Sequence, residues 1–200
     1  ALGELLIDFT PAGLSQNNNR LFEQNPGGAP ANVLTAVVKQ GGKGALISCV
    51  GNDAFGHELF ETISELGIGT QGIQFTDEAA TTLAFVTLSE SGDRSFSFFR
   101  NPGADQKIKK ENLNTRQIDS CQIFHFGSLS LSDEPSRSAA LFAADYAQKE
   151  GKIVSYDPNW RAPLWKSQQA GIEGMKLGLK YANILKLSSE ELNLLSDTND

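Results

Sequence analysis

The stretch that decides the fold reads NPGGAPANVLTAVVKQGG and covers residues 25–42. Two adjacent glycines, Gly27 and Gly28, come directly before an apolar run that predicts a helix. Glycines leave backbone N–H groups open at a helix N-terminus, where the dipole favours electron-rich atoms, and Asn32 adds a donor and an acceptor in the first turn. The stretch predicts a ligand site at the start of this helix, although a tight turn alone would use the same two glycines.

Outward from this stretch, apolar runs of strand length alternate with segments of helical period. The strand-like runs cover residues 1–9, 44–51, 121–129, 152–158 and 183–188, and the helical segments cover 53–67 and 136–151. This alternation predicts βαβ units and a parallel sheet. In the second helical segment we expect Ala139, Phe142, Ala143 and Tyr146 to face the sheet, because they recur at spacings of three and four.

Residues 81–100 break the alternation. Two alternating stretches flank the turn SESGD at 89–93 with no helix between them, which predicts a hairpin that projects as a mobile lid. Residues 12–26 are expected to supply a companion strand. Phe96, Phe98 and Phe99 crowd this small lid, so we expect it to be the association surface of a homodimer.

Composition and charge exclude several classes of partner. The 200 residues carry a formal net charge of −7, which gives no general attraction to nucleic acid or to an anionic membrane. The sequence shows no signal-peptide pattern and no long apolar span. Cys49 and Cys121 lie far apart in apolar runs. We expect a cytoplasmic protein with buried free thiols, no nucleic-acid partner and no membrane partner.

Polar side chains follow several of the predicted strands. Asp8 lies near the end of the first strand, Arg100 and Asn101 end the lid hairpin, and Asn159 and Arg161 follow the fourth strand. In an open α/β sheet, ligands bind beyond the carboxyl ends of the strands. Asp8 can accept from two hydroxyl groups, and the arginines can donate in a fixed fork. Together these residues predict a small polyhydroxylated ligand.

Structural roles remain open for the same residues. Asp8 can cap a turn, and Asn159 can form an Asx turn after its preceding proline. The stretch GNDAFG at 51–56 predicts a helix N-terminus rather than a ligand site. Trp160 and Trp165 are expected to be packing residues. The two histidines have no metal-ligand spacing.

Six motifs indicate which protein family the chain resembles. They read GELLIDF (3–9), GGAPAN (27–32), VGNDAFG (50–56), RNPGAD (100–105), YDPNWR (156–161) and KLSSEE (186–191). In this order and spacing the chain resembles the ribokinase-like carbohydrate kinases, and is most similar to their fructokinase branch. The resemblance implies a doubly wound, mostly parallel α/β sheet flanked by helices, with a small antiparallel β lid. It also implies transfer of the ATP γ-phosphoryl group to the 6-hydroxyl of fructose with Mg²⁺, and K⁺ is a further candidate ion.

The resemblance also assigns roles to individual residues. It implies contacts to the sugar from eight residues, which include the lid arginine and its neighbouring asparagine: Asp8, Gly27, Gly28, Asn32, Arg100, Asn101, Asn159 and Arg161. Arg161 is the implied catalytic residue, since a cation there steadies the transferring charge. In the last motif, Lys186 and Ser188 are implied phosphate contacts, and Glu191 is implied to hold Mg²⁺ through water.

One family motif is missing from the sequence. Ribokinase-like kinases carry a later Gly-Ala-Gly-Asp segment whose aspartate is the catalytic base, and residues 1–200 contain none. We therefore expect these residues to be the N-terminal two thirds of a single domain, with a lid at about 10–26 and 81–101, and to be inactive alone. A non-catalytic sugar-binding module, or a kinase for a ribofuranosyl nucleoside or a 2-keto-3-deoxy sugar acid, remains an alternative.

Overall fold

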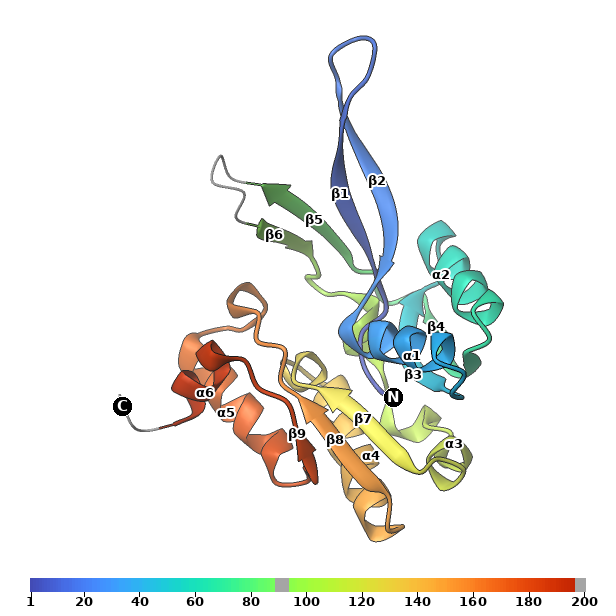
Figure 1. Cartoon of the computed structure of the whole chain (residues 1–200), viewed down its shortest axis with the longest axis vertical. Helices are drawn as coiled ribbons and strands as arrows, with labels where there is room; N and C mark the ends of the chain where they lie inside the picture. Colours follow the sequence, from blue (N-terminus) through green and yellow to red (C-terminus); the bar gives the residue numbers. More distant parts are fainter. Residues whose placement is uncertain (89–93, 197–200) are drawn as a thin grey trace.

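The computed structural model describes residues 1–88 and 94–196 and shows an α/β body from which a β lid projects (Figure 1). The strands are β1 (Leu6–Leu14), β2 (Arg20–Gly27), β3 (Ala45–Gly51), β4 (Gly69–Thr76), β5 (Leu83–Leu88), β6 (Arg94–Phe99), β7 (Ile123–Gly127), β8 (Ile153–Asp157) and β9 (Ile184–Leu185). The α-helices are α1 (Ala29–Lys39), α2 (Ala54–Glu65), α3 (Thr115–Asp119), α4 (Ser136–Lys149), α5 (Gln168–Leu179) and α6 (Ser189–Leu195). Short 3₁₀ turns are η1 (Ala104–Lys107), η2 (Lys110–Asn112), η3 (Leu129–Leu131) and η4 (Ala162–Leu164). The predicted turn at 89–93 lies outside the described residues.

The body contains a parallel sheet. β3 pairs with β4, and β7 pairs with β8, which pairs with β9. Leu2 joins the pair β3–β4 to the group β7–β8–β9, since it forms parallel bridges to Ile47 in β3 and to Phe126 in β7. The chain then leaves the body and enters the lid at β1. The predicted strand over residues 1–9 was therefore wrong in its bounds, because a continuous apolar run does not mark where the chain changes sheets.

Strand β4 had no counterpart among the predicted strands. Its sequence, GTQGIQFT, contains two glycines and two glutamines, so its hydrophobic pattern is weak. In the described residues it pairs with β3 alone, at the edge of the sheet. An edge strand needs less apolar surface than a central one, which explains why the pattern failed to reveal it.

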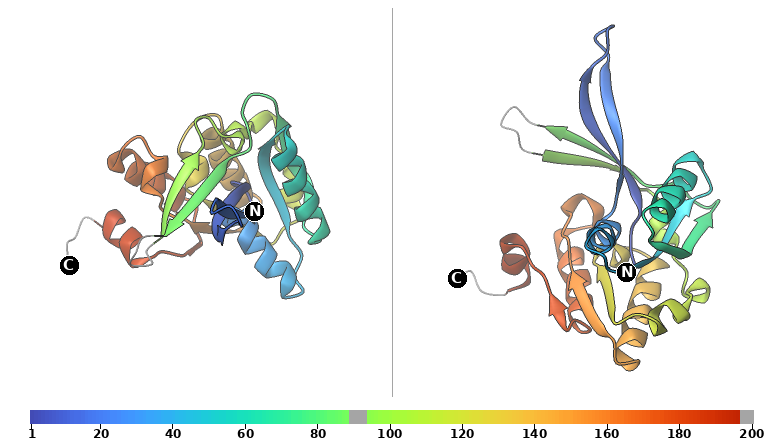
Figure 2. Two further views of the ribbon diagram at one scale, coloured as in Figure 1. Left: turned by 90° about the horizontal axis from the view of Figure 1, so that it is seen from above. Right: turned by 45° about the vertical axis from the view of Figure 1, so that its right-hand side comes forward.

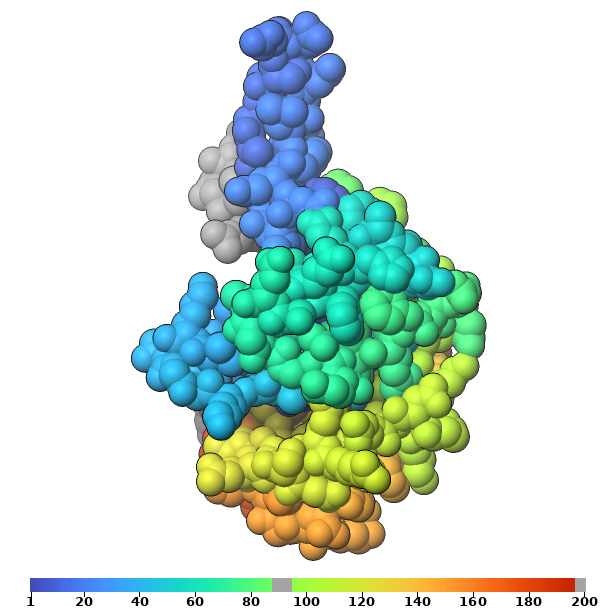
Figure 3. Space-filling view, turned by 90° about the vertical axis from the view of Figure 1, so that its right-hand side faces the viewer, coloured from blue at the N-terminus to red at the C-terminus, as the bar shows by residue number. Residues whose placement is uncertain are grey.

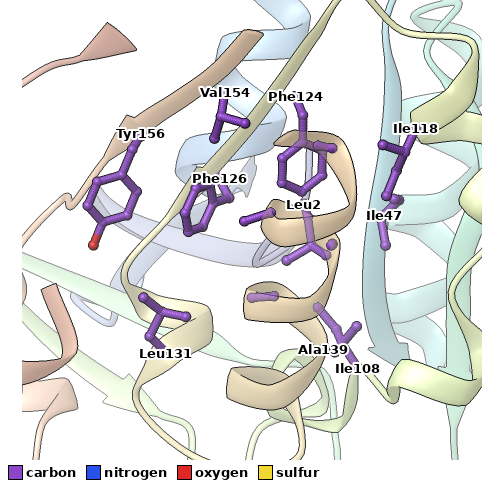
Figure 4. Close-up of a cluster of buried hydrophobic side chains, with 14 of the residues drawn as sticks. Leu2, Ile47, Ile108, Ile118, Phe124, Phe126, Leu131, Ala139, Val154 and Tyr156 are labelled. Atoms are coloured by element: carbon purple, nitrogen blue, oxygen red, sulfur yellow. The ribbon is translucent and has the colours of Figure 1, made fainter. Parts of the chain in front are cut away.

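Helices cover both faces of the parallel sheet. In β3, Leu46 and Val50 pack in a cluster with residues of α1 and α2, whereas Ile47 and Cys49 pack in a second cluster with α4. Figure 4 shows the second cluster, in which aromatic side chains of β7 and β8 lie beside α4. The doubly wound α/β fold is confirmed.

The face of α4 that packs on the sheet differs from the predicted one. It is an alanine stripe, with no solvent exposure at Ala139, Ala140, Ala143, Ala144 and Ala147. Phe142 and Tyr146 are only half-buried, and their rings stack on each other beside the stripe. Alanines at paired positions bring the helix close to the sheet, and the bulkier rings remain at its flank.

The lid is a four-stranded sheet in the order β2-β1-β5-β6. β1 pairs antiparallel with β2 and parallel with β5, and β5 pairs antiparallel with β6. The β1–β2 hairpin stands away from the body in the right-hand view of Figure 2 and in the space-filling view of Figure 3. The sheet begins at Leu6, four residues before the predicted lid boundary at residue 10.

A buried ion pair fixes the second lid hairpin to the body. The guanidinium of Arg100, one residue after β6, lies 2.7 Å from Asp105, and both side chains are at most 3% exposed. Thr82, just before β5, donates to the same carboxylate. Arg100 also donates to Ser132 Oγ and to the Leu129 carbonyl in the body. Both ends of the β5–β6 hairpin are thereby held at one point.

Two expectations about the chain's surroundings can be compared with this structure. Among the described residues, no helix is long and apolar enough to cross a membrane. Cys49 and Cys121 are both free; Cys49 is buried as predicted, whereas Cys121 is only half-buried, so the prediction of a buried thiol was wrong there.

We expect Asp105→Ala to lower the free energy of unfolding by about 3–5 kcal/mol, because it leaves the guanidinium of Arg100 buried without its partner. Urea unfolding followed by circular dichroism measures this loss. Glu78→Ala is the matched control, since the ion pair between Glu78 and Lys109 is solvent-exposed, and it should leave unfolding unchanged. Equal effects of the two substitutions would contradict the anchoring role of the buried pair.

Candidate functional site

A cavity of about 320 Å³ lies between the lid and the carboxyl ends of the parallel strands. The lid contributes residues of β1 and β6, and the body contributes the start of α1, η3 and the loop after β8. The lining residues are Glu4, Leu6, Asp8, Gly28, Ala29, Asn32, Phe96, Phe98, Leu129, Asn159 and Arg161. The structure therefore brings together five of the predicted site residues from three separate segments: Asp8, Gly28, Asn32, Asn159 and Arg161.

The two glycines allow the start of α1 to lie against β1. A Cβ atom on Gly27 would overlap the carboxylate of Asp8, and one on Gly28 would overlap the carbonyl oxygen of Glu4. Gly28 also has a φ of 111°, which strongly favours glycine. Gly27 thus borders the site by leaving room for the Asp8 side chain, and Gly28 lines the cavity itself.

Asp8 supplies the carboxyl group expected for hydroxyl recognition. Burial raises the pKa of its carboxyl, and the positive charge of Arg161 opposes that shift. Asn32 lies in the first turn of α1, where its N–H donates to the Gly28 carbonyl at 2.9 Å. The cavity therefore presents a carboxylate, an amide and a guanidinium together.

Backbone contacts shape the loop that carries Asn159 and Arg161. The N–H of Asn159 donates to Oδ1 of Asp157 at 3.2 Å, so the Asx turn belongs to Asp157. Asn159 itself adopts a left-handed conformation, with φ of 50°. Arg161 donates from Nη1 to the Trp160 carbonyl, and its guanidinium carbon lies 5.8 Å from the centre of the Phe96 ring. The loop is thus fixed with both side chains at the cavity.

The motif KLSSEE (186–191) supports the loop that carries Asn159 and Arg161. Glu191 is 3% exposed, and its two carboxylate oxygens accept from the N–H groups of Trp160 and Ser188, each at 2.7 Å. Burial alone would raise the pKa of Glu191, but these hydrogen bonds hold it below the usual range. Ser188 caps α6, and Lys186 pairs with Asp157 at 3.2 Å.

A metal site is not assembled by the described residues alone, since no three of their His, Cys, Asp and Glu side chains form a group that could hold an ion. Both oxygens of Glu191 are already engaged with backbone N–H groups. The Mg²⁺ role of Glu191 through water stays a prediction, as do the phosphate roles of Lys186 and Ser188.

Arg100 and Asn101 lie elsewhere. They border a second cavity of about 300 Å³, which shares only Phe98 with the first. The guanidinium of Arg100 is occupied by Asp105, Ser132 and the Leu129 carbonyl. In this structure the lid arginine is therefore a structural anchor, and its expected contact with the sugar is not formed by the cavity that Asp8 lines.

Sequence reasoning missed several lining residues. Phe96 and Phe98 face the cavity, and among the three expected lid aromatics only Phe99 is largely exposed, at 64%. Their spacing of two predicts a shared face of the strand but not which face. Glu4 was also missed, although an acidic residue inside the apolar run ALGELLIDF was an available signal.

Several residues that were expected to have structural rather than ligand-binding roles do have structural contacts. Asp53 caps α2 by accepting from Gly56 N–H at 2.8 Å. Trp160 and Trp165 stack at 6.3 Å, and they pack on glycines of α5. His125 lies in β7 and its Nδ1 is 3.1 Å from Ser155 Oγ.

Comparisons with known proteins identify the family of this chain. The model of the pfkB family carbohydrate kinases matches residues 1–200. The chain is 46% identical over 198 residues to a protein named probable fructokinase-5 from Arabidopsis thaliana, covering 98% of this chain and 61% of that protein. It thus spans about three fifths of the length of the curated relatives it matches.

Solved structures named as fructokinases have a similar fold. The fructokinase from Xylella fastidiosa superposes with a TM-score of 0.91 at 40% identity, over 97% of this chain and 60% of that one. A fructokinase double mutant from Vibrio cholerae, in a form with fructose, ADP and potassium bound, gives 0.87 at 32% identity, over 99% and 62%. From its motifs, its fold and these relatives, the chain belongs to the pfkB family of carbohydrate kinases.

Proposed function

We propose that this chain is the sugar-binding part of a fructokinase, which transfers the γ-phosphoryl group of ATP to the 6-hydroxyl of fructose. The observation that carries the proposal is the single cavity that gathers Asp8, Gly28, Asn32, Asn159 and Arg161. Its volume, about 320 Å³, is at the small end of the range for ligand sites and suits a monosaccharide. The relatives named as fructokinases support the choice of sugar.

Each lining group has a role suited to a neutral sugar. Asp8 accepts from two hydroxyl groups, and Asn32 both donates and accepts. Phe96 and Phe98 cover the ring from the lid and exclude water. Arg161 is the only cationic side chain among the lining residues that the structure describes, which favours a neutral ketose over a sugar acid.

Arg161 is proposed as the residue that acts on the transferring group. A cation beside the phosphoryl group meets more negative charge in the transition state than in the ground state, so it lowers the barrier to transfer. ATP and Mg²⁺ are the proposed cosubstrate and ion, with K⁺ as a further candidate because the Vibrio cholerae structure contains potassium. Lys186 and Ser188 remain proposed phosphate contacts, and Glu191 a proposed contact to hydrated Mg²⁺.

The catalytic base is proposed to lie outside these 200 residues. Asp8 is assigned to the sugar, and Glu191 holds two backbone N–H groups. A non-catalytic sugar-binding module is the competing function, and ADP release by the whole gene product with fructose and ATP distinguishes the two. The cytoplasm stays the proposed compartment, since both cysteines are free.

We expect Asp8→Asn to weaken fructose binding about 10- to 100-fold, because a hydrogen bond to a charged group contributes about 1.5–3 kcal/mol. Isothermal titration calorimetry of the whole gene product measures the change. Asp77→Asn is the matched control, since Asp77 is an exposed carboxylate that accepts from Asn52, and it should bind as the wild type does. If the Asp8 variant bound fructose with wild-type affinity, the cavity would not be the sugar-binding site.

Homodimerisation through the lid is the proposed assembly. Apolar side chains stay exposed at the outer part of the β1–β2 hairpin: Leu14 at 61%, Leu21 at 44% and Phe22 at 38%. With Pro11 and Val86 they line a groove of about 310 Å³. Such a patch on a projecting sheet suits a second copy of the chain.

We expect the double substitution Leu14→Ser and Leu21→Ser to shift the whole gene product from dimer to monomer in sedimentation velocity, because it removes apolar surface from the proposed interface. Val37→Ser is the control, since Val37 is similarly exposed at 39% but lies on α1. A wild-type protein that is monomeric throughout, or a variant that stays dimeric, would contradict the proposed interface.

A further inference from the structure

We propose that Glu4 is a positioning residue of the sugar cavity: it holds the first turn of α1, from which Asn32 reaches the sugar. The proposal rests on the function proposed above and deepens it. Neither the motifs nor the relatives assign a role to Glu4.

Glu4 supplies a cap that α1 otherwise lacks. Gly28 occupies the N-cap position and no side chain there bonds to the helix. The N–H of Ala29 instead donates to Oε1 of Glu4 at 2.8 Å, across 25 positions of the sequence. Free N–H groups at a helix start need such an acceptor, and losing one destabilises the first turn.

Two contacts fix this turn to Glu4, in the segment just before β1. The Glu4 side chain bonds Ala29, and the Glu4 carbonyl lies so close to Gly28 that a Cβ atom there would overlap it. Glu4 is followed four residues later by Asp8, and Ala29 is followed three residues later by Asn32. The two proposed hydroxyl-binding side chains are therefore held at a set separation by Glu4.

The Glu4 carboxyl titrates near neutrality. Burial raises its pKa to about 7, and the Ala29 N–H opposes this shift. Among charged groups, Asp105 raises the pKa and Arg100 lowers it, while Asp8 and Arg161 line the same cavity. The first turn of α1 has no acidic residue, and η3 and the lining part of β6 contribute only uncharged side chains.

This titration has a definite sign for sugar binding. Below pH 7 Glu4 is protonated and neutral in the folded protein. As the pH rises through 7 it becomes a second negative charge at the cavity that Asp8 lines, and a charged group draws water to a turn that should exclude it. If fructose binds only the neutral form, its dissociation constant rises about tenfold between pH 6 and pH 8.

Calorimetry with fructose at pH 6 and pH 8 on the whole gene product tests the proposal. Wild type should show the tenfold change. Glu4→Gln keeps an acceptor for the Ala29 N–H and cannot ionise, so it should bind as wild type at pH 6 and keep that affinity at pH 8. Glu4→Ala loses the cap and should bind about tenfold more weakly at pH 6. Glu61→Gln, an exposed carboxylate on α2, should follow the wild-type profile.

A second readout does not need the sugar. In ¹⁵N NMR of the free protein, the Ala29 amide should shift with a midpoint near pH 7 in wild type and show no such midpoint in Glu4→Gln. An Ala29 amide without this midpoint, or a Glu4→Ala variant that binds fructose as wild type does, would overturn the role of Glu4. A wild type that titrates at Ala29 but binds no fructose would instead overturn the proposed function.

Discussion

The close approach of the segment 27–29 to the start of β1 is the constraint on which the site depends. Only glycines fit there, because Cβ atoms at Gly27 and Gly28 would overlap Asp8 and Glu4. Because this approach places α1 and β1 side by side, Asn32 and Asp8 line one cavity. The lid strand and the helix that bounds the site are thus positioned by the close contacts of this one segment.

Support for the rest of the cavity comes from buried carboxylates that do not face the ligand. Glu191 accepts from two backbone N–H groups beneath the Arg161 loop, and Asp105 holds the Arg100 guanidinium at the root of the second lid hairpin. These carboxylates are satisfied by protein donors, so they stabilise loops. The carboxylate of Asp8 has a different role, since it lines the open cavity near one guanidinium.

Sequence reasoning reached the fold class and five of the eleven residues that line the cavity for physical reasons. Strands and long helices have periods that the sequence records, and polar residues after strands mark the ligand edge of an α/β sheet. It placed Arg100 with the sugar because a motif gives a residue's position along the chain but not its partners. Only the folded chain shows that Asp105, five residues later, already pairs with this arginine. Glu4 escaped notice for a related reason, since its partner Ala29 lies on another element.

The most direct test of this account is a crystal structure of the whole gene product with fructose bound. The account predicts sugar hydroxyls within hydrogen-bonding distance, about 2.5–3.2 Å, of the Asp8 carboxylate and the Asn32 amide, with Phe96 and Phe98 over the ring. Fructose bound instead in the second cavity, against Arg100 and Asn101 and away from Asp8, would contradict it.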